Sequence, residues 1–330
     1  MSKATVQDIF LRFYPRYLEK YTPSANQSKV AHCIINCKTG AYGANISICD
    51  DCGHPQIHYN SCRNRCCPMC QALPREKWMD QRREDVLEAP YFHVVFTVPQ
   101  ELNPLIYNNQ QVLYDAMYHS VSSTINELTE DSKHLGAKVG YICVLHTWGS
   151  EMNYHPHIHV ILLGGGLTPK NQWRDKGEEF FLPVKVMSKL FRGKYLAELK
   201  TLWEAQKLQF HGSSEKYRNH YSFKELLDVC YEKDWIPHCK KTFNGAQSVI
   251  NYLGKYTHRI AISNHRIIRM DDNTVTYYVK DYREEGKWKE YTISGTEFIR
   301  RFLMHVPPKR FVRIRHYGLL CTRSKTKHLT

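Results

Sequence analysis

Apolar side chains recur at helical spacing in several stretches of the chain. Near the N-terminus the repeat joins Ile9, Phe10, Phe13 and Tyr17 and predicts a short amphipathic helix over 6–17. Further helices are expected over 74–89, 110–128, 186–208, 246–262 and 296–305. The periodicity therefore predicts helices near both ends of the chain and in its middle.

Other stretches are rich in β-branched and aromatic residues, which favour strands. The strands expected on this basis cover 92–98, 140–148, 157–163, 235–239, 266–270, 274–281 and 288–293. Pro99 ends the first of these strands, and the three glycines 164–166 are expected to stop the third. Strands that alternate with helices, with hairpin-like pairs among them, predict an α+β fold.

The charge balance suggests a partner. Forty-six Lys and Arg against 32 Asp and Glu give a net charge of +14, which is typical of a protein that contacts a polyanion such as DNA. No window is long and apolar enough to cross a membrane, and the N-terminus does not resemble a secretory signal. We therefore expect a cytoplasmic, nucleoid-associated protein without a membrane partner.

The cysteines point to metal rather than disulfides. Eight of the twelve lie between Cys33 and Cys70, in a segment poor in apolar runs, which predicts thiolates that need a metal to fold. Cys49-Asp-Asp-Cys52 and Cys67-Pro-Met-Cys70 are two C-x2-C knuckles fourteen residues apart. That spacing predicts four thiolates around one structural Zn²⁺.

Further ligands nearby allow a second zinc ion. They are Cys37, Cys62, Cys66 and either His54 or His58. Arg63 and Arg65 lie between the knuckles and suit contacts with DNA phosphates. The sequence thus predicts one or two zinc ions beside a basic surface.

Histidines alternate along the third predicted strand, so His155, His157 and His159 share one face. Two imidazoles two residues apart on a strand can share one divalent cation and leave open positions for a phosphate oxygen and water. His146 supplies a third ligand if its strand pairs antiparallel with this one, and Glu151 is the competing third ligand.

Tyr252 and Tyr256 lie four residues apart in the helix expected over 246–262, so both phenols are expected on one face, with Cβ atoms ~5–6 Å apart. Periodicity alone describes them as rim aromatics beside an apolar stripe. The neighbouring basic side chains are Lys255, His258 and Arg259. Their positive field would favour an ionised phenol and stabilise a pentacovalent phosphorus.

A strand with H-x-H followed by a helix with Y-x3-Y resembles the HUH nucleases, and the surrounding sequence resembles the insertion-sequence 91 family of transposases. The matching passages are 62–70, 92–99, 146–149, 155–159, 252–264 and 311–318. They span nearly the whole chain. The chain departs from the family at Arg65-Cys66-Cys67-Pro68, where the family typically has Arg-His-Cys-Pro.

This resemblance implies a small zinc-binding domain ahead of a ferredoxin-like HUH nuclease core with an antiparallel central sheet. The expected divisions are an N-terminal helix and zinc-binding domain over 1–89, a catalytic domain with an inserted helical region over 90–265, and a basic strand-rich region over 266–330. It also implies that His157 and His159 bind Mg²⁺ or Mn²⁺, and that Tyr252 and Tyr256 are nucleophiles.

The expected function is a DNA transposase that nicks and rejoins single-stranded transposon ends and target DNA through 5′-phosphotyrosine intermediates. A rolling-circle replication initiator would use the same chemistry, whereas a zinc-ribbon DNA-binding regulator would be non-catalytic. The chain has no P-loop motif, so strand opening would need another protein such as a host helicase. The sequence leaves the oligomeric state open.

Overall fold

The computed structural model describes residues 4–83, 86–87, 89–175, 182–235, 237–243, 248–249, 252, 254, 260–281 and 284–321. The chain divides into two compact units. The first unit combines Met1–Trp78, Trp148–Tyr154 and His258–Lys309, and the second combines Met79–Thr147, His155–Thr257 and Arg310–Thr330. The region 266–330 predicted from the sequence divides between these units at Lys309 and Arg310, and the domain bounds expected from the sequence stay a prediction.

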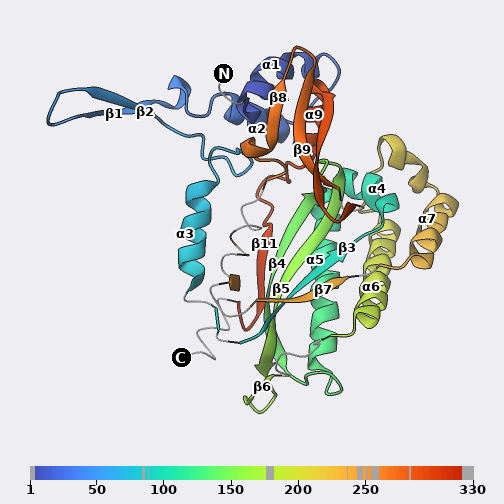
Figure 1. The fold of residues 1–330 in the computed structure, drawn as a ribbon. Coiled ribbons are helices and arrows are strands. Elements are labelled where there is room, and N and C mark those ends of the chain that lie inside the picture. The colour runs from blue at the N-terminus through green and yellow to red at the C-terminus, as the bar shows by residue number, and fades with distance from the viewer. Residues whose placement is uncertain are drawn as a thin grey trace. The chain divides into compact units, whose positions relative to one another are not determined.

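The first unit is built around two N-terminal helices and a small sheet (Figure 1). Its main elements are α1 (Val6–Leu18), α2 (Ala25–Ile35), β8 (Ile267–Met270), β9 (Thr274–Asp281), β10 (Lys287–Ser294) and α9 (Gly295–Met304). A capping box between Thr5 and Asp8 begins α1. Phe10 and Phe302 then join α1 to α9 with ring centroids 5.2 Å apart. These contacts confirm the helices predicted at both ends of the chain.

The first unit also carries a two-stranded hairpin that extends away from the rest of that unit (Figure 1). The short 3-10 turn η1 (Gly40–Tyr42) leads into β1 (Ala44–Ile48), which pairs antiparallel with β2 (Pro55–Tyr59). All ten strand residues are exposed. Packing against other elements therefore does not hold this hairpin in place.

The second unit contains the larger sheet, with strand order β11-β4-β5-β3-β7 and β6 paired to β5. Its strands are β3 (Tyr91–Thr97), β4 (Lys138–Trp148), β5 (Tyr154–Leu167), β6 (Trp173–Asp175), β7 (His238–Phe243) and β11 (Ile314–Gly318). The pairs β11–β4, β3–β5, β3–β7 and β5–β6 are all antiparallel. The predicted α+β class with an antiparallel central sheet is confirmed.

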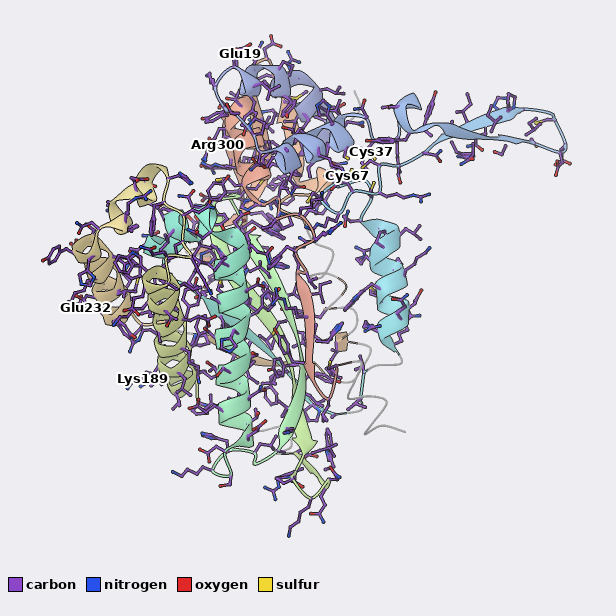
Figure 2. All side chains as sticks on the ribbon, turned by 180° about the vertical axis from the view of Figure 1, so that it is seen from behind. Glu19, Cys37, Cys67, Lys189, Glu232 and Arg300 are labelled. Atoms are coloured by element: carbon purple, nitrogen blue, oxygen red, sulfur yellow. The ribbon has the colours of Figure 1, made fainter. Side chains whose placement is uncertain are left out.

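Helices cover one face of this sheet (Figures 1 and 2). The helical elements of this unit are η2 (Gln100–Leu102), α4 (Asn103–Asn108), α5 (Gln110–Glu130), α6 (Val184–Glu204), η3 (Gly212–Arg218) and α7 (His220–Glu232). A further helix, α3 (Ala72–Arg83), is divided between the two units and is not one of the helices on this face. Phe96 of β3 meets Phe191 of α6 with ring centroids 5.0 Å apart. The Leu145 amide donates to the Tyr118 hydroxyl of α5 at 3.0 Å. The opposite face of β3, β4 and β5 carries histidines.

The structure corrects two strand boundaries. β5 does not stop at the glycines but runs to Leu167, because these positions need a bare backbone: a Cβ on Gly166 would lie 2.2 Å from the Lys138 carbonyl oxygen. β7 begins at His238 instead of Trp235, whose buried indole donates to the Cys230 carbonyl at 2.9 Å.

Of the helix expected over 246–262, residues 248, 249, 252 and 254 are described and helical. Residues 260–262 are described and are not helical, so the helix was predicted to run too far, and the remaining positions lie outside the described residues. Among the described helices, none is long and apolar enough to cross a membrane.

Candidate active site and cysteine cluster

Three histidines converge on the face of the second unit's sheet that is opposite to α5 and α6. His157 and His159 lie on β5, and His146 lies on the neighbouring strand β4. One ring nitrogen of each lies within 4.8 Å of the others, and the Nε2 atoms of His157 and His159 are 3.1 Å apart. Strand alternation places these side chains together, so the sheet itself builds the cluster.

Hydrogen bonding prepares His157 for ligation. Its Nδ1 lies 2.7 Å from the backbone carbonyl oxygen of His155. A carbonyl only accepts, so Nδ1 carries the proton and Nε2 is left with a lone pair directed at His159. Three neutral imidazoles fit a divalent transition ion better than Mg²⁺, which prefers oxygen ligands.

A fourth histidine connects this cluster to Tyr252. His93 of β3 has its Nε2 2.9 Å from Nδ1 of His159, and the two rings stack at 5.1 Å. The Tyr252 hydroxyl lies 2.9 Å from Nδ1 and 2.8 Å from Nε2 of His93. Tyr252, His93 and the three-histidine cluster thus form one continuous polar chain.

Burial sets the protonation of this chain. Burial, together with nearby His238, lowers the pKa of His93 to about 4, and burial also lowers the pKa of His155. His146 is only 3% exposed and His159 9% exposed. We therefore expect His93 to be neutral near pH 7, with a proton on one ring nitrogen and a hydrogen-bond acceptor at the other.

His93 is the functional residue that reading the sequence missed. It stands between Phe92 and Val94 on a predicted strand, where a single histidine in an apolar run looks like a packing residue. A signal was present, because two-residue alternation places His93, Val95 and Thr97 on one face. Only the pairing of Val95 with His159, and of Thr97 with His157, brings that face beside the ligands.

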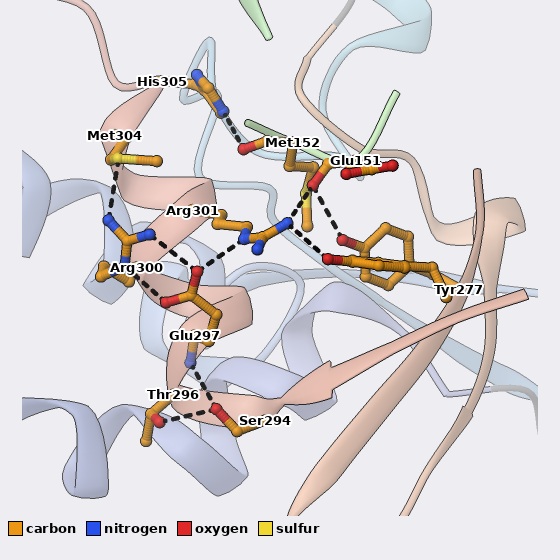
Figure 3. A network of polar contacts seen from close by, with 11 residues as sticks. Glu151, Met152, Tyr277, Ser294, Thr296, Glu297, Arg300, Arg301, Met304 and His305 are labelled. Atoms are coloured by element: carbon orange, nitrogen blue, oxygen red, sulfur yellow. Dashed lines mark hydrogen bonds and ion pairs between the residues drawn. The ribbon is translucent and has the colours of Figure 1, made fainter. Parts of the chain in front are cut away.

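Glu151, the competing third ligand, does not belong to the histidine cluster among the described residues. It lies in the first unit, where its backbone carbonyl accepts hydrogen bonds from the Tyr277 hydroxyl at 3.1 Å and Arg301 at 2.9 Å (Figure 3). The grouping of His146 with His157 and His159 favours the histidine as third ligand.

The second tyrosine and its basic neighbours are not placed. Tyr256, Lys255, His258 and Arg259 all lie outside the described residues. Arg63 and Arg65 are exposed in the first unit, and Arg65 donates to the carbonyl of Pro308 at 2.8 Å. That bond accounts for Arg65 structurally, and a phosphate contact at either arginine stays a prediction.

Four cysteines converge in the first unit: Cys37, Cys62, Cys67 and Cys70. Figure 2 labels two of them, Cys37 and Cys67. Cys70 Sγ lies 3.5 Å from Cys37 Sγ and 3.6 Å from Cys62 Sγ. Burial raises the pKa of Cys67 well above its usual range and that of Cys62 to about 12. Without a cation the Cys62 and Cys67 thiols would stay protonated, whereas burial of Cys70 is outweighed by hydrogen bonds from Cys37, Cys62 and Ser61, which lower its pKa. The four-sulfur donor set fits tetrahedral Zn²⁺.

This grouping corrects the predicted ligand set. Cys49 and Cys52 do not join Cys67 and Cys70, because the exposed β1–β2 hairpin carries them at its tip. Cys37 and Cys62 take their places. Among the other second-site candidates, Cys66 is buried outside the cluster, and His54 is exposed in the tip turn.

An antiparallel sheet with three converging imidazoles and a phenol beside them has the features of an enzyme that cuts and joins DNA strands. The family model described as a putative transposase matches residues 140–328, and the transposase zinc-binding domain model of the insertion-sequence 91 type matches residues 9–98. The chain belongs to the insertion-sequence 91 family of DNA transposases. The four-cysteine cluster within 9–98 supports structural zinc.

Two relatives illustrate the extent of the match. The chain is 41% identical over 326 residues to the putative transposase y4qJ of Sinorhizobium fredii (strain NBRC 101917 / NGR234), covering 98% of this chain and 82% of the relative. It is 26% identical over 293 residues to the transposase for insertion sequence element IS801 of Pseudomonas savastanoi pv. phaseolicola. That match covers 88% of this chain and 69% of the relative.

The chain also has a distant likeness to solved structures. The conjugative relaxase TrwC in complex with OriT DNA, in its metal-free form, aligns with 13% identity over 50% of this chain and 71% of that chain. Its TM-score of 0.27 is too low for a shared fold to be inferred.

Proposed function

We propose that this transposase nicks and rejoins single-stranded transposon ends, with Tyr252 as a nucleophile. The observation that carries the proposal is the link from Tyr252 through His93 to His159, with hydrogen-bond distances of 2.8 to 2.9 Å. A phenol in such a position lies beside the ligand set that would hold a scissile phosphate. Nucleophile and phosphate site therefore share one face of the sheet.

His146, His157 and His159 would hold the divalent ion and leave positions open for phosphate oxygens. When bound, such an ion polarises the scissile phosphate and neutralises charge in the transition state. The all-nitrogen donor set favours Mn²⁺ or a later transition ion over Mg²⁺.

His93 positions Tyr252 through its proton. With Nε2 of His159 as the atom that would hold the ion, the proton of that ring would lie on Nδ1 and would be donated to Nε2 of His93. The neutral His93 ring must then carry its proton on Nδ1, 2.9 Å from the Tyr252 oxygen. His93 would therefore donate to the phenol oxygen and stabilise negative charge on it.

The phosphotyrosine bond that forms conserves the energy of the phosphodiester bond that breaks. The Tyr252 oxygen attacks phosphorus, the bond from phosphorus to the 3′-oxygen breaks, and a 5′-phosphotyrosine forms. The proton lost by the phenol balances the proton gained by the 3′-hydroxyl. The reverse attack by a 3′-hydroxyl rejoins strands, so the chemical steps need no nucleoside triphosphate.

Tyr256 would supply a second nucleophile for the other end, because residues four apart on a helix lie on one face. Lys255, His258 and Arg259 would add positive charge near these phenols, while Arg63 and Arg65 would contact phosphates in the zinc-binding region. Target DNA is a second partner, and a host helicase would open the strands.

A replication initiator shares this chemistry but not the family, and a zinc-ribbon regulator needs no nucleophile. Full-length protein should form a covalent adduct with single-stranded transposon ends in Mn²⁺. Tyr252→Phe should lose the adduct formed at Tyr252. The double variant Tyr252→Phe with Tyr256→Phe should form no adduct. Tyr221→Phe is the matched control, because its side chain is 80% exposed. An adduct that persists in the double variant would refute the assignment of both nucleophiles.

A further inference from the structure

The tip of the β1–β2 hairpin carries two thiols that the site described above does not use. Cys49 and Cys52 are both exposed, and the four-cysteine cluster of the first unit is already complete without them. Among the described residues, the C-x2-C knuckle Cys49–Cys52 therefore has no partner knuckle that would complete a zinc site.

The tip has the backbone arrangement of a metal knuckle. The amides of Asp51 and Cys52 donate to the Cys49 sulfur, and the Gly53 amide donates to the Cys49 carbonyl at 2.9 Å. Gly53 has φ +68°, a conformation that L residues rarely adopt. Amides directed at a sulfur and a tight turn closed by glycine are features of C-x2-C knuckles that bind a metal ion.

The knuckle supplies only half of a tetrahedral site. Zn²⁺ in a structural site takes four ligands, and among the described residues no third histidine, cysteine or carboxylate groups with Cys49 and Cys52. The ring of His58 lies away from the tip turn on β2, with Nε2 3.2 Å from the Ser47 hydroxyl. The missing ligands must come from elsewhere.

The hairpin surface indicates what completes the site. Ala44, Ile46 and Ile48 pair directly with Tyr59, Ile57 and Pro55, so all six share one face of the ribbon. Ile46 is 66% exposed and Ile48 65% exposed, an apolar surface that commonly marks an interface.

The charge of the hairpin itself favours a protein partner over nucleic acid. Residues 39–62 contain Asp50 and Asp51 but no Lys or Arg, in a chain whose net charge is +14. A phosphate backbone would find no cationic partner here. A second copy of this chain instead offers an identical knuckle and an identical apolar face, as a two-fold symmetric interface requires.

We propose that Cys49 and Cys52 of two copies together hold one tetrahedral Zn²⁺, which joins the two hairpins at their tips. Four thiols lose their protons as four sulfur–zinc bonds form, with no change of oxidation state. The joined tips bring the apolar faces of the two ribbons within reach of each other, so that Ile48 of each copy gains an apolar neighbour. The ion at the tip is thus distinct from that of the four-cysteine cluster.

Zinc content and molar mass test this together. We expect full-length protein to contain about 1.5 zinc ions per chain, one in the closed cluster and half of a shared one, and to have twice the mass of one chain in light scattering. The double variant Cys49→Ser with Cys52→Ser should contain about one zinc per chain and have the mass of a single chain. Because both side chains are exposed, this variant should fold normally.

Controls separate the alternatives. His54→Gln should keep the shared ion and the doubled mass, since its side chain is not a ligand in this arrangement. A single-chain mass with about two zinc ions would show that the knuckle closes within one chain, and a single-chain mass with about one would show an empty tip; either overturns the proposal. A dimer that survives the double serine variant also overturns it. Single-strand nicking should be unchanged in that variant, so failure here is distinguishable from failure of the proposed activity.

Discussion

The four-cysteine cluster and the three-histidine cluster are both sets of converging ligands, but the chain builds them in opposite ways. The cysteine ligands come from turns and loops; they are Cys37, Cys62, Cys67 and Cys70. The histidines come from adjacent strands, whose other face packs against α5 and α6. Paired strands hold ligands in place without an ion, whereas turns that bring thiols together depend on the ion to stay closed.

Removing a cysteine ligand should have the largest effect. Cys70→Ser should release the zinc of this cluster and make the segment 36–71 sensitive to proteases, since apparent zinc binding in small zinc domains is worth about 10–16 kcal/mol. Zinc analysis and limited proteolysis would measure both. Cys66→Ser is the control, because Cys66 is buried but lies outside the cluster. Equal zinc loss in both variants would contradict the ligand set.

Removing a histidine ligand should affect activity and not the fold. His157→Ala should reduce adduct formation by at least about 100-fold, because the ion that stabilises the transition state loses a ligand. Its thermal unfolding should stay close to that of the unaltered protein. His155→Ala on the same strand face is the matched control, and it retains the carbonyl that His157 uses. Normal cleavage by His157→Ala would remove the metal site from the mechanism.

Changing His93 tests how far the sheet positions the nucleophile. His93→Ala should lower Mn²⁺ affinity or activity by about 10 to 100-fold, the usual range for a residue that orients a metal ligand. His93→Gln should restore part of both by keeping a side-chain donor and acceptor. His119→Ala is the control, since its exposed ring pairs with Glu198 and does not belong to the histidine cluster. If His93→Ala weakens nicking but leaves Mn²⁺ affinity unchanged, His93 acts only on Tyr252 and has no role in orienting His159.

The smallest expected effect is a change in the stability of the first unit with pH, caused by His305 and independent of zinc. His305 is buried, its Nε2 donates to the Met152 carbonyl at 3.0 Å, and burial lowers its pKa to about 4 (Figure 3). Because the folded pKa is below that of an unfolded histidine, the contribution of His305 is complete above pH ~6.5 and is lost as pH falls toward 4.

We expect this loss to reach about 1 kcal/mol by pH 5.5. His305→Gln keeps a donor for the carbonyl but does not titrate, so its unfolding free energy should change less between pH 7 and 5.5. Parallel pH profiles for the two proteins would show that His305 is not the titrating group.

Much of the fold was predictable because local patterns were consistent with it. The periodicity of Ile9, Phe10 and Phe13 predicted α1, and the β-branched and aromatic run at 92–98 predicted β3. The prediction that glycines 164–166 end the strand was wrong, because glycine also occurs inside a strand where a neighbouring group leaves no room for a Cβ. Here Gly165 and Gly166 pair with β6, where a Cβ on Gly165 would lie 2.5 Å from the Trp173 ring.

By itself the sequence determined the α+β class, the need for a metal in the cysteine-rich segment, and the common face of His157 and His159, since each follows from composition or from a two-residue repeat. Tertiary structure alone decided which cysteines meet and that His93 reaches both His159 and Tyr252. The physical reason is that spacing along a chain limits what a turn can bring together, whereas strand register and hairpin direction select the actual partners.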